Sequence, residues 1–175
     1  GGLAPGLWKS LSLMDRGNLN DSGNTPPNLT AIELEMLGLG TCEELQMGDY
    51  ELQPLSREKR FLRSDTPNEG EYFLFECRDN EGWDSAIGGS GLLIYHIDRS
   101  NRNAGYSDYY RVTLTAYERW RKAQVNCRPD HECAALCAAN EDAQDVSELF
   151  FHGLFHKSFS SDTKPAFRSW EGEAS

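Results

Sequence analysis

Two apolar segments constrain the fold of this chain more than any other feature. Residues 71–77 read EYFLFEC, and residues 91–98 read GLLIYHID. A strand with one face in water alternates apolar and polar residues, whereas these segments carry apolar side chains at successive positions. Both therefore predict strands that are buried on their two faces. Residues 50–55 and 59–63 are weaker strand candidates.

A short helix is predicted over residues 31–37. Thr30 and Glu33 have the spacing of a capping box, in which each side chain bonds the other residue's backbone amide. Gly38 follows, and glycine readily adopts the left-handed conformation that ends many helices. Three apolar residues fall on one face of this helix: Ile32, Met36 and Leu37.

The order of these segments predicts an α+β fold with one short N-terminal helix, followed by a mixed or antiparallel β-sheet with long irregular loops. Residues 115–125 contain good helix formers, and residues 132–139 predict a further strand or short helix. A length of 175 residues suits one structural unit, so we expect residues 1–175 to form a single unit. The chain begins at Gly1 without an initiator methionine and ends close to Trp170, which we interpret as truncation at both ends.

The charge and hydropathy of the chain argue against two classes of partner. It carries 17 basic and 28 acidic side chains, a net charge of −11. Proteins bind a polyphosphate backbone through cationic side chains that displace its counterions, so this balance argues against a nucleic-acid partner. The chain has no apolar run long enough for a transmembrane helix, which argues against a membrane span.

Histidine motifs give no complete active site. His131 and Glu132 open like the His-Glu-x-x-His zinc signature, but Ala135 stands where the second histidine is needed. His152 and His156 have a spacing of four, yet no glutamate base lies between them, and the glycine after His152 disfavours a helix. We therefore expect no metal ligands within this chain.

Two polar features remain as candidates for a site. His96 and Asp98 lie two residues apart on one predicted strand, so they share a face, where a carboxylate can orient an imidazole. A hydrogen-bonded core histidine is the more common arrangement, and we interpret these two residues as a structural polar pair. The oxygen-rich loops 15–24 and 79–84 are calcium candidates, although neither has the spacing of an EF-hand.

Five cysteines occur, at positions 42, 77, 127, 133 and 137. Cys127 and Cys133 flank a turn that contains Pro129, where their Cα atoms can approach within disulfide range. We predict a disulfide between them in an exported protein. The alternative, that all five are reduced and partly buried, stays open. Cys137 is a rival partner if its segment is helical.

Several segments, read in order, resemble one protein family. They are WKSLSLMDRG (8–17), TPPNLTA (25–31) with MLG (36–38), NEGEYFLFE (68–76), GWD (82–84) with GSGLLIYHID (89–98), VN (125–126) with His131, and FS (159–160) through TKP (163–165) to Trp170. Together they resemble the immune inhibitor A family of bacterial secreted zinc metalloproteases. Each block is modest by itself, and their shared order over nearly the whole chain carries the resemblance.

The resemblance implies a function in protein hydrolysis. By resemblance, Met14 lies beneath the catalytic zinc as an apolar floor, and Asp15, Arg16 and Gly17 border the substrate cleft. Family members carry a His-Glu-x-x-His-x-x-Gly-x-x-His zinc helix just upstream, and this chain lacks it. We therefore expect a segment of a secreted or cell-envelope metalloendopeptidase that acts on protein or peptide substrates. It would need zinc held by the missing N-terminal part of the same polypeptide, and it would be inactive alone.

Two positions depart from the family pattern. The family often has Phe-Pro-Gly where this chain has His152 between Phe151 and a glycine, and it commonly has asparagine where this chain has Cys77. The alternative function is a non-catalytic β-rich binding or interaction module of a secreted multidomain protein. Three histidines and a glutamate at the zinc-helix spacing, upstream of Leu3 in the parent sequence, would decide for the enzyme. Their absence would decide for the module.

Overall fold

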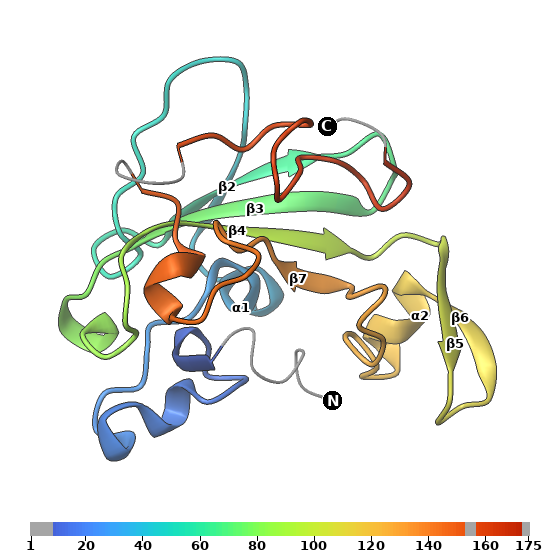
Figure 1. Cartoon of the computed structure of the whole chain (residues 1–175), viewed down its shortest axis with the longest axis horizontal. Helices are drawn as coiled ribbons and strands as arrows, with labels where there is room; N and C mark the ends of the chain where they lie inside the picture. The colour runs from blue at the N-terminus through green and yellow to red at the C-terminus, as the bar shows by residue number, and fades with distance from the viewer. Residues whose placement is uncertain (1–8, 153–156, 173–175) are drawn as a thin grey trace.

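A five-stranded mixed sheet organises the computed structural model, which describes residues 9–152 and 157–172 (Figure 1). Its strands are hydrogen-bonded in the order β1-β2-β3-β4-β7. β1 pairs with β2 in parallel, and the other neighbouring strands are antiparallel. The strand bounds are Thr41–Glu44 for β1, Arg60–Asp65 for β2, Glu71–Arg78 for β3, Gly91–Asp98 for β4 and Ala134–Leu136 for β7.

A small second sheet and several short helices complete the fold. This sheet consists of β5 (Asn103–Ser107) and β6 (Val112–Thr115). The helices are α1 (Ala31–Leu37), α2 (Ala116–Arg121) and the 3-10 helices η1 (Lys9–Leu11), η2 (Gly17–Gly23), η3 (Gly82–Asp84) and η4 (Val146–Leu149). The predicted α+β class is confirmed. Among the residues that the structure describes, no helix has the length and apolar character needed to cross a membrane.

The central strands β3 and β4 are covered on both faces, which explains their continuous apolar sequence. One face belongs to the larger hydrophobic core, together with helix α1; its residues are Tyr72, Leu74, Leu93, Tyr95 and Ile97. The other face packs beneath the C-terminal segment, residues 157–172; the residues in contact are Phe73, Phe75, Ile94, Phe159 and Phe167. In Figure 1 α1 lies below the sheet, and the C-terminal segment, in red, passes above it. The two buried strands predicted at 71–77 and 91–98 are confirmed.

Helix α1 has the predicted bounds because both of its ends are fixed. Thr30 Oγ1 accepts a hydrogen bond from Glu33 N at 3.3 Å, and Glu33 Oε2 accepts one from Thr30 N at 2.7 Å, which completes the predicted capping box. Gly38 ends the helix in the left-handed region, with a φ of 66°. The capping box and Gly38 therefore begin and end the helix where the sequence predicted.

Three weaker predictions differ from the structure in extent. Residues 50–55 are not a strand, since Pro54 has no amide proton and contributes only an isolated bridge. Helix α2 ends at Arg121, before the predicted end at Val125, because Ala123 adopts a left-handed φ of 52°. Of the segment 132–139, only the three residues of β7 form a strand.

Candidate functional site

Met14 lies on a tight turn between η1 and η2, and the surrounding backbone holds this turn. Gly17 N donates to Ser12 O at 3.0 Å and closes the turn. Leu11 and Ser12 are fully buried, so the turn is anchored in the core. Met14 itself is 61% exposed. The fold therefore presents this methionine at the surface on a fixed backbone.

The buried carboxylate of Glu33 joins this turn to helix α1. Its Oε1 accepts from Ser12 Oγ at 2.8 Å and from Met14 N at 3.3 Å. Its Oε2 accepts from the amide and the hydroxyl of Thr30, at 2.7 and 2.9 Å. The predicted capping residue therefore has a second role. Sequence reasoning missed it because Ser12 and Glu33 are 21 residues apart.

An apolar groove of about 270 Å³ adjoins Met14. Its main lining residues are Leu13, Met14, Met36, Leu37, Trp120 and Val125. Met36 and Leu37 are 58% and 61% exposed, so part of the predicted apolar face of α1 points outward. Contiguous exposed apolar surface of this kind marks interaction sites.

The three residues expected to border a substrate cleft lie in different environments. Asp15 is half-buried, and its Oδ2 accepts from Lys9 N at 2.7 Å. Gly17 is buried, and a Cβ at this position would lie 2.5 Å from Ser12 O, so only glycine fits. Arg16 is exposed. Asp15 and Gly17 therefore support the turn, and Arg16 has the most accessible side chain of the three.

The predicted polar pair of His96 and Asp98 is corrected by the structure. His96 Nε2 donates to Glu71 Oε1 at 2.7 Å, and His131 Nε2 donates to Asp98 Oδ2 at 2.7 Å. Each member of the predicted pair therefore has its partner on another segment of the chain. Glu71 pairs opposite Asp98 in the sheet and so lies diagonally across from His96. A carboxylate does orient each imidazole, but each pair forms between different segments of the chain.

Four aromatic rings stack in a column on this face of the sheet. The ring centroids of Phe73 and His96 are 4.4 Å apart. The Trp170 ring lies 5.3 Å from that of His96 and 4.5 Å from that of His131. Trp170 N also donates to Glu71 Oε1 at 2.7 Å. This aromatic column fastens the C-terminal segment to β3 and β4.

The carboxylates beside the aromatic column favour their ionised forms. Burial by itself raises the pKa of Glu71, but hydrogen bonds, first that from His96, outweigh burial and hold the pKa below its ordinary value. Burial also opposes ionisation of Asp98, yet hydrogen bonds from His131 and the following loop lower its pKa. Both imidazoles are bound by carboxylates; His96 is packed between Phe73 and Trp170, and His131 stacks against Trp170. The aromatic column therefore acts as a structural clip.

A second polar cluster lies fully buried on the opposite face of the sheet. Arg78 donates to Asp84 at 2.6 and 2.9 Å and to Glu76 at 3.1 Å. Glu76 also accepts from the Tyr95 hydroxyl at 2.8 Å and from the amide of Ala31, the first residue of α1. Burial raises the pKa of Glu76 even though Arg78 lies beside it. The three charged residues are at most 1% exposed, so this buried ion network is structural.

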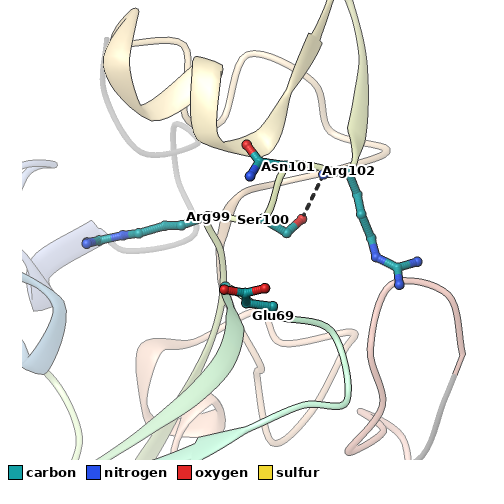
Figure 2. A pocket seen from close by; sticks show the side chains of 6 residues that line it. Glu69, Arg99, Ser100, Asn101 and Arg102 are labelled. Atoms are coloured by element: carbon teal, nitrogen blue, oxygen red, sulfur yellow. Dashed lines mark hydrogen bonds between the residues drawn. The ribbon is translucent and has the colours of Figure 1, made fainter.

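A polar pocket of about 350 Å³ lies where β3 begins and β4 ends. Its lining residues are Glu69, Gly70, Arg99, Ser100, Asn101 and Arg102. Figure 2 shows the side chains of Arg99 and Arg102 pointing away from each other. The Arg99 guanidinium lies over the Trp120 ring, 4.3 Å from its centroid, and Arg102 pairs with Glu171. The two cations therefore do not converge on a ligand in this pocket.

Metal binding has no support within residues 9–152 and 157–172. In these ranges no group of three or more His, Cys, Asp or Glu side chains is arranged to hold an ion. In the calcium candidate loop 79–84, the carboxylate of Asp84 is occupied by Arg78.

The two histidine motifs lie in different settings. His131 is bound to Asp98, and the residues that follow it enter strand β7 instead of a zinc helix. His152 comes directly after Phe151, which forms a bridge with Leu92. His156 lies outside the residues that the structure describes.

The predicted disulfide between Cys127 and Cys133 is also corrected, because both are free thiols in the structure. Cys127 is exposed, whereas Cys133 is fully buried and its amide donates to Val125 O at 3.2 Å. The turn directs the two side chains into different environments despite their short separation in sequence. Burial raises the pKa of the Cys133 thiol to about 12, and that of Cys137 also to about 12, so neither is a reactive thiolate.

Comparisons with known proteins add no family to these observations: no protein-family model, curated protein or solved structure matched the chain. The evidence for function is therefore the turn at Met14, the adjoining groove and the resemblance in sequence.

Proposed function

We propose that this chain forms the C-terminal part of the catalytic region of a secreted bacterial zinc metalloendopeptidase. The observation that carries the proposal is the position of Met14, which is exposed on a turn that Glu33 and the core hold in place. An exposed methionine beside an apolar groove is expected where another part of the same protein covers it. The resemblance in sequence supports the floor of a zinc site as the role of this methionine.

In this proposal the zinc ligands belong to an upstream segment of the same polypeptide. The described residues offer no set of three ligands, so none of them is assigned a step in the chemistry of the metal. Zinc in such enzymes activates water for attack on a peptide carbonyl group. This chain contributes the floor of the zinc site, which is the apolar side chain of Met14. Glu33 binds the backbone of Met14 and holds it in place, and Arg16 is exposed beside it.

The groove beside Met14 is the surface that we assign to the upstream segment. Leu13, Met36 and Leu37 are exposed around it, and covering them would remove apolar area from water. The same contact would bring the ligand-bearing segment next to the fixed methionine. This explains why α1 keeps apolar residues on a face that has no cover within the described residues.

The test compares this chain with a longer polypeptide that contains the sequence upstream of Leu3. We expect the longer protein to retain stoichiometric zinc through dialysis and to cleave casein until a chelator is added. The shorter chain is expected to do neither, because it lacks the ligands. Chelator-sensitive cleavage by the shorter chain, or the absence of three histidines and a glutamate upstream, would reject the proposal in favour of a non-catalytic module.

A substitution in the longer protein tests the role of Met14. We expect Met14→Ala to reduce zinc affinity or kcat/KM by roughly tenfold, the size of effect seen when a residue that supports metal ligands is removed. Met47→Ala is the matched control, because the side chain of Met47 is fully exposed. Equal activity of the two variants would show that Met14 has no part in the site.

A further inference from the structure

The unit formed by β5, β6 and α2 stands apart from the main sheet. β5 and β6 form a sheet of their own, and α2 packs against both strands. In Figure 1 this unit projects at the right-hand end of the molecule. A two-stranded ribbon buries little surface by itself, so much of its side-chain area faces solvent.

This unit is a basic region in an acidic protein. Residues 99–128, which include this unit and the turns on either side of it, carry seven basic and two acidic side chains, a net charge of +5, whereas the whole chain has a net charge of −11. Arg99, Arg102 and Arg128 pair with Glu35, Glu171 and Asp130, and Arg119 is buried, so Arg111, Arg121 and Lys122 are the accessible cations of this range that have no ion pair within the described residues. The residues outside this range therefore have a net charge of −16. A local excess of one sign attracts a partner of the opposite sign and speeds its association.

The unit also exposes most of the tyrosines in the chain. Four of the seven lie here and all are exposed: Tyr106, Tyr109, Tyr110 and Tyr117. The rings of Tyr109 and Tyr110 meet edge to face at 4.9 Å. Lys122 Nζ lies 4.7 Å from the centre of the Tyr110 ring, and the Arg121 guanidinium lies 5.8 Å from that of Tyr117. The tyrosine–cation band is defined by these contacts as Tyr109, Tyr110, Tyr117, Arg121 and Lys122.

A pocket of about 260 Å³ is lined by Glu118 and by two members of the tyrosine–cation band, Arg121 and Lys122. The Glu118 carboxylate accepts from Thr115 N at 2.9 Å, where it completes the capping box of α2. Arg121 and Lys122 contact tyrosine rings and form no ion pair with a carboxylate of the described residues. Two cations therefore remain at the pocket for an acidic partner.

We propose that the tyrosine–cation band docks an acidic polypeptide segment. Tyrosine and arginine dominate the energetics of protein interfaces, because each provides a large contact area and directional hydrogen bonds. Arg121 and Lys122 complement carboxylates, and the exposed rings complement the apolar parts of a peptide. A long polyanion would extend past the band and meet the acidic remainder of the protein, whereas a short peptide contacts the band alone. This inference does not depend on the proposed peptidase function.

The test measures binding of a fluorescently labelled short glutamate peptide by anisotropy at low and high salt. We expect saturable binding that weakens as salt rises, since the contacts are solvent-exposed charges. The double variant Arg121→Gln, Lys122→Gln should weaken binding by at least about tenfold, and Tyr109→Ser by several-fold. Tyr109 is 79% exposed, so its replacement leaves folding intact and tests the surface alone. The matched control is Arg57→Gln, Lys59→Gln, which removes the same charge from an exposed loop elsewhere.

Four outcomes would overturn the proposal. The first is absence of binding, and the second is equal binding by the double variant and the control. The third is tighter binding of a heparin oligosaccharide than of the glutamate peptide, which would assign the tyrosine–cation band to an acidic polysaccharide. The fourth is a concentration-dependent dimer in sedimentation that the double variant abolishes, which would assign the band to a second copy of this chain. Binding of the glutamate peptide that only the band variants weaken would support the proposal.

Discussion

Buried charges at single positions hold much of this protein in place. Glu33 accepts hydrogen bonds from both the Met14 turn and the start of α1. Arg78 lies between Glu76 and Asp84, so its one positive charge faces two carboxylates in the interior. Removing one member of such a group leaves the others buried without a partner, which is more unfavourable than the loss of the pair itself.

Replacement of Arg78 tests this directly. We expect Arg78→Met to lower the free energy of unfolding by about 3–5 kcal/mol, because Glu76 and Asp84 then remain buried without a cation. Urea denaturation followed by tryptophan fluorescence measures the change. Arg57→Met is the control: Arg57 pairs with Glu81 at 2.8 Å in full solvent, and its loss should change stability little. Similar effects of the two variants would contradict a structural role for the buried ion network.

At the scale of secondary-structure elements, the features that could be predicted from sequence are the local ones. Helix α1 was predictable because Thr30, Glu33 and Gly38 signal its ends within a few residues. The same spacing recurs at Thr115 and Glu118, so the start of α2 carried a signal that could have been used. The continuous apolar runs of β3 and β4 were sufficient to predict buried strands.

The aromatic column could not be predicted in this way. Its assembly requires the register between β3 and β4, which pairs Glu71 with Asp98, and the return of Trp170 to the sheet. Neither the strand register nor the return of Trp170 can be predicted from a short sequence pattern. The strand alone indicated that His96 and Asp98 share a face, but their partners come from other segments. Phe167 and Trp170 near the end of the chain were visible in the sequence, but aromatic residues there were interpreted as a sign of truncation and not of packing against the sheet.

The aromatic column fastens the C-terminal segment to the sheet, so loss of the column should release this segment while the rest of the fold stays in place. We expect Trp170→Ala to reduce stability by about 1–3 kcal/mol and to make residues 157–172 more susceptible to protease. Limited proteolysis with mass spectrometry locates the cleavage. Trp83→Ala is the control, because the side chain of Trp83 is 57% exposed. Uniform susceptibility along the chain of the Trp170 variant would argue against a local clip.

At the scale of the whole molecule, acidic side chains dominate the charge. The buried carboxylates differ in how they make stability depend on pH: Glu71 and Asp98 act in one direction and Glu76 in the other. The pKa values of Glu71 and Asp98 are lowered in the folded protein, so their stabilising effect is fully present above their ordinary values of about 4.3 and 3.9. This effect is lost as pH falls through the folded-state pKa values. The pKa of Glu76 is raised by burial, so its protonation at low pH relieves an unfavourable buried charge.

Acid titration of stability separates these contributions. We expect the free energy of unfolding to fall as pH is lowered below about 4.5, because the unfolded chain takes up protons that the folded carboxylates resist. Asp98→Asn should flatten this dependence, since the residue no longer titrates. Denaturation curves collected from neutral to acidic pH give the slope. An Asp98→Asn variant with the slope of the parent protein would contradict the assignment.

The bond between Trp170 and Glu71 links residues 99 positions apart. During synthesis, strands β3 and β4 can pair as soon as residue 98 has left the ribosome, and α1 is already available for one of their faces. The face that carries Phe73 and Phe75 has to wait for the rings of Phe159, Phe167 and Trp170. Nascent chains with such an uncovered apolar sheet are targets for chaperones and for aggregation. Residues 157–172, which are translated well after β3 and β4, thus determine when this face of the sheet is protected.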